Sequence, residues 1–172
     1  MEAWAVTQFN LQAQYFPLLD SDKENVDFVT WLREPFDRMR SHYNYWKSSY
    51  DPLSSQALHR RVVEDNWSFH RFCFSDEMKN IYLQFLWAFP LDHFSFIGIT
   101  EFYDEDFAWF WKNYFGVDMR ARWENMGSTG GQGNNLKDKG LAREFREHHR
   151  DDYQIYEAAL SLRLERMTRN VG

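Results

Sequence analysis

The sequence predicts an α/β domain in which a small parallel sheet is flanked by many helices. Two uncharged runs rich in aromatic and β-branched residues, 28–32 and 94–100, have the composition of strands that are buried on both faces. The residues between these runs show helical spacing, as the crossover between two parallel strands requires. With 172 residues, the chain is expected to form one domain, 1–172, that buries a sizeable core.

The first of these runs leads directly into a helix. Pro35 cannot continue a strand ladder, but it is preorganised for the first position of a helix. The apolar residues that follow recur at helical spacing, and they are Phe36, Met39, Tyr43 and Trp46. Residues 28–46 are therefore predicted to form a strand, a two-residue turn and a helix.

Arg33 lies at the carboxyl end of this predicted strand. In open α/β sheets, this edge and the free N–H groups at the start of the next helix are where anionic ligands bind. The planar guanidinium of arginine pairs two phosphate oxygens at once. The hydroxyl of Ser41 would reach the same anion if the helix folds back past the strand end. The spacing leaves an alternative, in which Arg33 only pairs with a surface carboxylate.

Three helices are predicted between the two strands. Ser54 is expected to cap a helix that runs through residue 62, and Asn66 to start a short helix that runs through residue 72. Ser75 is expected to cap a longer helix, in which apolar residues continue at helical spacing up to Phe89 and Pro90 marks the end.

Glu101 closes the second predicted strand. Because it would project beside Arg33, its carboxylate is a candidate base or a group that orients the acceptor. The alternative is that Glu101 caps the following helix or pairs with an arginine. That helix has acidic residues at its start, 104–106, and ends at Gly116, a residue that favours a left-handed terminator.

The last third of the chain is predicted to hold a loop and two helices. The glycine-rich composition of residues 126–135 indicates a loop, which is either a connector or, with the lysines that follow it, a cover over a nucleotide. Residues 136–150 and 152–167 have the spacing of helices.

Three segments in this order carry a resemblance to a known family. They are residues 33–43 (REPFDRMRSHY), 96–102 (FIGITEF) and 152–159 (DYQIYEAA). Together they resemble motifs of the carbohydrate sulfotransferases, including the heparan sulfate 2-O and 6-O branch. The resemblance covers residues 28–167 approximately, and its motifs are moderately specific.

The resemblance implies a fold, a co-substrate and two binding residues. The fold would be the P-loop-NTPase-like sulfotransferase fold, here incomplete at its N-terminus. The reaction would transfer a sulfuryl group from 3′-phosphoadenosine-5′-phosphosulfate (PAPS) to the hydroxyl of a glycan or another acceptor. Arg33 and Ser41 match the motif that binds the 3′-phosphate of this co-substrate. The catalytic base has no identifiable counterpart.

One part of the family pattern is absent. The family opens with a strand and a Lys/Thr/Ser-rich loop that holds the 5′-phosphosulfate, and nothing in residues 1–27 resembles it. Where some members carry a catalytic histidine, the nearest counterpart here is Gln14, which cannot take a proton. Three interpretations stay open: a truncated sulfotransferase, a non-catalytic relative that binds a nucleotide, a glycan or a protein, and an unrelated α/β domain in which Arg33 is structural.

Composition excludes some classes of partner. The net charge of −6, from 26 acidic and 20 basic residues, argues against a nucleic-acid-binding protein. A local cluster of Arg33, Arg38 and Arg40 still permits an anionic ligand. No residues show metal-ligand spacing, and the single cysteine, Cys73, permits no intrachain disulfide.

The sequence contains no targeting signal. No run is long enough to cross a membrane, and the first residues lack the features of a signal peptide. As it stands, the chain is expected to be cytoplasmic, whereas a fragment of an animal-type member of the resembled family would belong to the Golgi lumen. The oligomeric state is left open.

Overall fold

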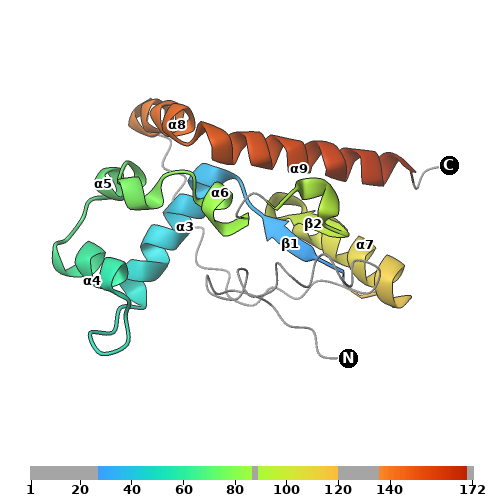
Figure 1. The fold of residues 1–172 in the computed structure, drawn as a ribbon, viewed down its shortest axis with the longest axis horizontal. Helices are drawn as coiled ribbons and strands as arrows, with labels where there is room; N and C mark the ends of the chain where they lie inside the picture. The colour runs from blue at the N-terminus through green and yellow to red at the C-terminus, as the bar shows by residue number, and fades with distance from the viewer. Residues whose placement is uncertain (1–26, 87–88, 120–135, 170–172) are drawn as a thin grey trace.

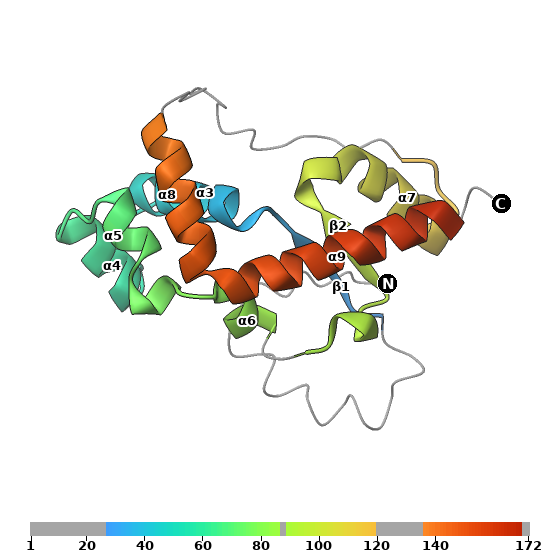
Figure 2. The same ribbon diagram turned by 90° about the horizontal axis from the view of Figure 1, so that it is seen from above.

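The computed structural model describes residues 27–86, 89–119 and 136–169. Its strands and helices are β1 (Val29–Leu32), α3 (Pro35–Ser48), α4 (Ala57–Glu64), α5 (Phe69–Cys73), α6 (Ile81–Leu86), β2 (Phe96–Ile99), α7 (Tyr103–Phe115), α8 (Leu136–His148) and α9 (Arg150–Arg169), with short 3-10 turns at Asp76–Met78, Leu91–His93 and Thr100–Phe102. In Figure 1, α9 runs lengthwise along the two strands, and α3, α4 and α5 lie together at one end. The view from above places α6 and α7 on opposite sides of α9 (Figure 2).

The sheet consists of β1 and β2, which pair in parallel. Trp31 pairs with Gly98 and Leu32 with Ile99, so both strands end at the same edge. This confirms the predicted α/β class and the predicted parallel crossover. All four residues of β2 are buried, since α7 and α9 both pack against this strand. The helix after β1 begins at Pro35, as predicted, because Pro35 occupies the first helical turn.

Apolar side chains form two clusters that meet at the turn between β1 and α3. One cluster joins α3 to α4, α5 and α8 through residues such as Phe36, Phe72 and Phe145. The other joins the strands to α6 and α9 and includes Leu32 and Tyr156. Because Leu32 belongs to one cluster and Phe36 to the other, the turn between them is held from both sides.

Two capping predictions in the crossover are wrong. Helix α4 begins after Gln56, and the hydroxyl of Ser54 instead donates to Asp51. Helix α5 begins after Ser68, whose hydroxyl accepts a hydrogen bond from the Arg71 N–H. Both helices nevertheless form where helical spacing predicts them. The spacing of apolar residues determines where a helix forms, whereas several nearby polar residues can serve as its cap, so the exact first residue is harder to predict.

The predicted helix from Ser75 to Phe89 is broken. A 3-10 turn, Asp76–Met78, is separated from α6 by Asn80, whose φ of 48° is left-handed. Asparagine tolerates this conformation better than most residues. The break is stabilised from α9 and its preceding turn, because the Asn80 N–H donates to Nδ1 of His149 over 3.2 Å and its side chain donates to Asp151 over 2.7 Å.

The C-terminal helices agree with the sequence. Helix α7 has acidic residues in its first turn and ends at Gly116, where a φ of 67° gives the predicted left-handed terminator. The two helices predicted over residues 136–150 and 152–167 are α8 and α9. The predicted loop at residues 126–135 lies outside the described residues. Within the described ranges, no helix combines the length and the apolar character that a membrane span requires.

Gly98 is expected to be essential to the pairing of the strands. A Cβ at Gly98 would lie 2.3 Å from Cε2 and Nε1 of Trp31, its partner in the sheet. We therefore expect Gly98→Ala to lower the free energy of unfolding by about 3 kcal/mol, because overpacking displaces the Trp31 ring. Urea unfolding followed by circular dichroism measures this change.

A second glycine provides the control for this substitution. Gly140 lies within α8, and a Cβ there would meet no atom within 4 Å. Gly140→Ala is expected to raise the free energy of unfolding by about 0.5–1 kcal/mol, since alanine loses less backbone entropy in a helix. Equal effects of the two substitutions would contradict the close approach of Trp31 to Gly98.

Candidate functional site

The candidate site lies at the edge where β1 and β2 both end. Because Leu32 pairs with Ile99, the residues that follow the two strands come together at this edge. The Glu34 N–H donates to Oε1 of Glu101 over 2.8 Å. Glu101 therefore lies beside the turn that carries Arg33, as predicted.

Tyr82 of α6 holds the backbone of Arg33. Its hydroxyl accepts a hydrogen bond from the Arg33 N–H over 2.8 Å and donates to the Arg33 carbonyl over 2.6 Å. Burial raises the pKa of Tyr82 to about 12, so that the hydroxyl keeps its proton at neutral pH. Strand β1 ends at Leu32 because the Tyr82 hydroxyl forms hydrogen bonds with the N–H and the carbonyl of Arg33, which would otherwise pair with a neighbouring strand.

Arg33 and Ser41, the two predicted phosphate ligands, are not joined to each other by any hydrogen bond. The Arg33 side chain is half-buried, and within the part of the chain that the structure describes, its guanidinium makes no hydrogen bond or ion pair. Ser41 lies exposed on α3, six residues after Pro35 and about 9 Å along the helix axis. The alternative, in which Arg33 pairs with a surface carboxylate, is therefore not observed among the described residues.

The start of α3 is closed, which corrects the expectation of free N–H groups there. The Glu34 carboxylate accepts a hydrogen bond from the Asp37 N–H over 2.7 Å and caps the helix. Pro35, the first residue of the helix, has no N–H. An anion at this edge would consequently depend on the Arg33 side chain rather than on the helix terminus.

Two tyrosines of α9 hold the two carboxylates of the site. Tyr153 and Tyr156 share one face of the helix, and their hydroxyls donate to Oε1 of Glu34 and, over 3.0 Å, to Oε2 of Glu101. Burial, and the hydrogen bond to a carboxylate, raise the pKa of both tyrosines. All four carboxylate oxygens thus accept a hydrogen bond from the protein, and neither carboxylate pairs with an arginine among the described residues.

In the sequence, Tyr153 and Tyr156 lie in a predicted helix and in one of the segments that carry the resemblance, but neither pattern indicated their role in the site. Their i, i+3 spacing shows that they share a face. It does not show which face meets the strand edge, because that depends on the packing of α9 against β2 and α6.

The predicted basic cluster is separated by the fold. The Arg38 guanidinium lies over the Tyr82 ring at 4.8 Å and is 3.8 Å from Asp152, whereas Arg40 lies over the Phe36 ring and pairs with Asp37. Only Arg33 remains without a partner of opposite charge in the described ranges.

The nearest histidine in the sequence, His42, does not face the strand edge. Its ring packs edge-on against Trp46 and Phe72, between α3 and α5. Burial, reinforced by the nearby Arg38 charge, lowers the pKa of His42 to about 4. This residue therefore belongs to the core rather than to the site.

No family model, no curated protein and no solved structure matches the chain. No relative therefore assigns a role to Arg33, Ser41 or Glu101. Among the described residues, no group of three or more His, Cys, Asp and Glu side chains is placed to hold a metal ion. Among the described residues, the site contains one guanidinium without an ion-pair partner, on a residue whose backbone Tyr82 holds, next to two carboxylates whose four oxygens each accept a hydrogen bond.

Proposed function

We propose that the chain is a sulfotransferase domain that transfers a sulfuryl group from PAPS to a carbohydrate hydroxyl, and that Arg33 and Ser41 bind the 3′-phosphate. The observation that supports this proposal most is the guanidinium of Arg33 at the carboxyl end of β1, which has no hydrogen bond or ion pair within the described residues. Among the described residues, neither Glu34 nor Glu101 forms an ion pair with this guanidinium, and their four oxygens accept hydrogen bonds from backbone N–H groups and tyrosine hydroxyls. A phosphate is the partner that fits a planar fork left free in this way.

The reaction would depend mainly on positioning. A sugar hydroxyl attacks the sulfur in line and its proton passes to water, while adenosine 3′,5′-bisphosphate leaves with the electrons of the broken S–O bond, by analogy with phosphoryl transfer. Arg33 and Ser41 would fix the leaving nucleotide through its 3′-phosphate. Because both oxygens of Glu101 already accept hydrogen bonds, a positioning role suits this carboxylate better than proton abstraction.

A non-catalytic domain that binds the same nucleotide is the second candidate. The observation that favours it is the state of Glu101, the candidate base, since both of its carboxylate oxygens already accept hydrogen bonds from the protein. Transfer of radiolabelled sulfate from PAPS to a panel of glycans distinguishes the two candidates. Nucleotide binding without transfer would favour the second.

Calorimetric titration with adenosine 3′,5′-bisphosphate tests the site that both candidates share. We expect the wild-type chain to bind, and Arg33→Ala to weaken binding at least tenfold, since a charge-assisted hydrogen bond contributes about 1.5–3 kcal/mol. Ser41→Ala is expected to weaken binding about threefold, because a neutral hydrogen bond contributes about 0.5–1.5 kcal/mol.

Two controls make this titration specific. Arg143→Ala removes an exposed arginine of α8 and is expected to leave the affinity unchanged. Adenosine 5′-monophosphate lacks the 3′-phosphate, so the wild-type chain and Arg33→Ala are expected to bind it equally. Unchanged affinity of Arg33→Ala for the bisphosphate, or no binding by the wild-type chain, would overturn the assignment.

A further inference from the structure

We infer that Asp152 is a positioning residue for Arg33, and that it acts through the first turn of α6 and the hydroxyl of Tyr82. The consequence of this for nucleotide binding rests on the proposed function. The positioning itself does not, because it concerns only contacts among described residues.

Asp152 holds the start of α6. Its carboxylate is fully buried, and Oδ1 accepts hydrogen bonds from the backbone N–H of Tyr82 over 2.8 Å and of Leu83 over 3.4 Å. The first N–H groups of a helix have no partner within the helix. In a helix of six residues such as α6, this single carboxylate from α9 therefore satisfies a large part of the N-terminal turn.

Tyr82 passes this constraint on to Arg33. Its backbone N–H is held by Asp152, and its hydroxyl is bonded to both the N–H and the carbonyl of Arg33. The ring is buried, so it has little freedom to move without its backbone. A displacement of the first turn of α6 must therefore move the hydroxyl away from the Arg33 backbone.

Arg38 connects Asp152 to the same ring by a second route. Its guanidinium lies 4.8 Å from the centre of the Tyr82 ring and 3.8 Å from Oδ2 of Asp152, at a side-chain exposure of 15%. Burial raises the pKa of Asp152 to about 6, so the carboxylate is ionised and attracts Arg38 at neutral pH. Asp152 thus fixes the backbone of Tyr82 directly and its ring through Arg38.

Amide hydrogen exchange of Arg33, measured by NMR on the full chain, tests this relay without any ligand. We expect a protected Arg33 amide in the wild-type chain, and at least tenfold faster exchange in Tyr82→Phe, which keeps the buried ring and removes only the hydroxyl. Asp152→Ala is expected to accelerate the exchange similarly. Asp152→Asn, whose side-chain oxygen still accepts from α6, is expected to restore most of the protection.

The double variant and a control separate positioning from general destabilisation. In the Tyr82→Phe background, Asp152→Ala is expected to add little to the exchange rate of the Arg33 amide, because the hydroxyl that connects Asp152 to Arg33 is already absent. Glu157→Gln, which removes a carboxylate of α9 that pairs with Arg146 and not with α6, is expected to change nothing. An Arg33 amide that stays protected in Tyr82→Phe, or effects of the two substitutions that multiply, would overturn the inference.

Titration of the same variants with adenosine 3′,5′-bisphosphate separates this inference from the proposed function. We expect Asp152→Ala to weaken binding about tenfold and Asp152→Asn to weaken it less, in the order of their exchange rates. If the wild-type chain does not bind while the exchange rates change as expected, the proposed function fails and the positioning role stands. Binding that depends on Arg33, with an Arg33 amide that Asp152→Ala leaves protected, would refute the positioning role alone.

Discussion

Replacement of Asp106 by alanine is expected to lower the free energy of unfolding by about 3–5 kcal/mol. Asp106 is fully buried, and its Oδ1 accepts hydrogen bonds from Nε of Arg163 over 2.9 Å and from Nη2 of Arg166 over 3.0 Å. Its Oδ2 accepts from the Ile99 N–H over 2.7 Å. Alanine would deprive two partly buried cations and one buried N–H of the same carboxylate.

Asp106 connects three elements of the fold, so its removal is expected to weaken the packing between them. It lies in the first turn of α7, its arginine partners belong to α9, and Ile99 is the last residue of β2. One carboxylate therefore joins two helices to the strand whose end carries Glu101. Removal of one partner from a buried ion pair costs far more than the pair contributes, because the remaining charge stays buried without compensation.

The neighbouring residue provides a matched control. Glu105 also pairs with Arg163, through Nη2 over 2.6 Å, but its side chain is 69% exposed. Glu105→Ala is expected to change the free energy of unfolding by less than about 1 kcal/mol, as is usual for exposed ion pairs. Urea unfolding of both variants measures the difference, and similar values for the two would mean that Asp106 is not the central member of this network.

Local signals in the sequence predicted the elements on which the site is built. Pro35 fixes the start of α3 and Gly116 fixes the end of α7, and both act within a few residues along the chain. The uncharged runs that became β1 and β2 were recognisable for the same reason, although each strand is shorter than predicted.

Features that depend on distant partners were not predictable from the sequence. Asn80 interrupts a helical pattern because His149 and Asp151, about 70 residues away, take its N–H and its side chain. The Glu34 carboxylate that caps α3 accepts a second hydrogen bond from the hydroxyl of Tyr153, which is 119 positions away. Spacing within α3 indicated a basic cluster, yet which arginine turns inward is decided by Asp152 on another helix.

The stability of the protein is expected to rise with pH between about pH 4 and 6.5. Burial lowers the pKa of both His42 and His149 to about 4, whereas an unfolded histidine titrates near 6.5. In this range both side chains are neutral when folded and take up a proton on unfolding. Stability from these groups is therefore present above about pH 6.5 and is lost as the pH falls toward 4.

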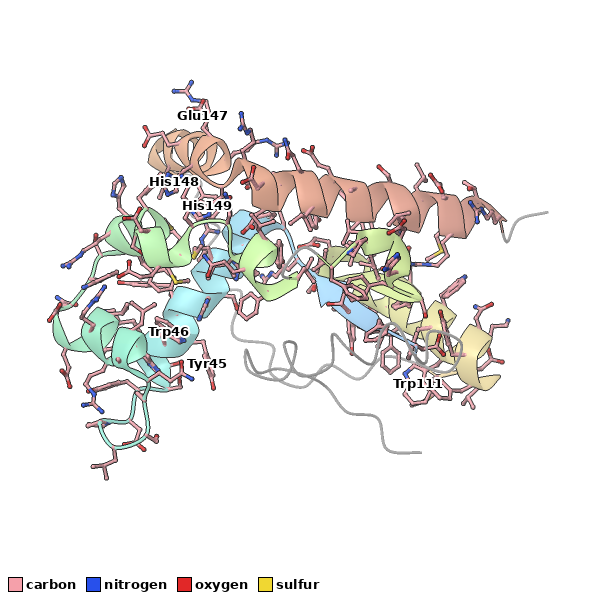
Figure 3. All side chains as sticks on the ribbon, in the orientation of Figure 1. Tyr45, Trp46, Trp111, Glu147, His148 and His149 are labelled. Atoms are coloured by element: carbon pink, nitrogen blue, oxygen red, sulfur yellow. The ribbon has the colours of Figure 1, made fainter. Side chains whose placement is uncertain are left out.

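The geometry of His149 explains its resistance to protonation. Nε2 lies 2.7 Å from the carbonyl of Cys73 and donates to it, and Nδ1 accepts from the Asn80 N–H over 3.2 Å. A proton on Nδ1 would face another N–H, so the folded state favours the neutral ring. His149 lies in the turn between α8 and α9, beside His148 (Figure 3). Its ring also stacks on the ring of Phe145, with the ring centres 3.9 Å apart.

Asp152 has the opposite effect from the two histidines on how stability depends on pH. Burial raises its pKa to about 6, above the usual 3.8, despite the lowering effect of Arg38, so its contribution to stability is present at low pH and is lost as the pH rises through 6. Between about pH 4 and 6, the two histidines take up two protons on unfolding and Asp152 releases one. For these three groups together, the net uptake of one proton corresponds to a slope of about 1.4 kcal/mol per pH unit.

Urea unfolding at about pH 4.5, 5.5 and 6.5 measures this slope, and His149→Gln provides the decisive variant. The glutamine amide can donate to the Cys73 carbonyl and accept from the Asn80 N–H, but it does not titrate. We expect the slope of this variant to be smaller than that of the wild type by about 1.4 kcal/mol per pH unit, because unfolding takes up one proton fewer. A wild-type profile that is flat, or one that His149→Gln leaves unchanged, would contradict the neutral, buried state of His149.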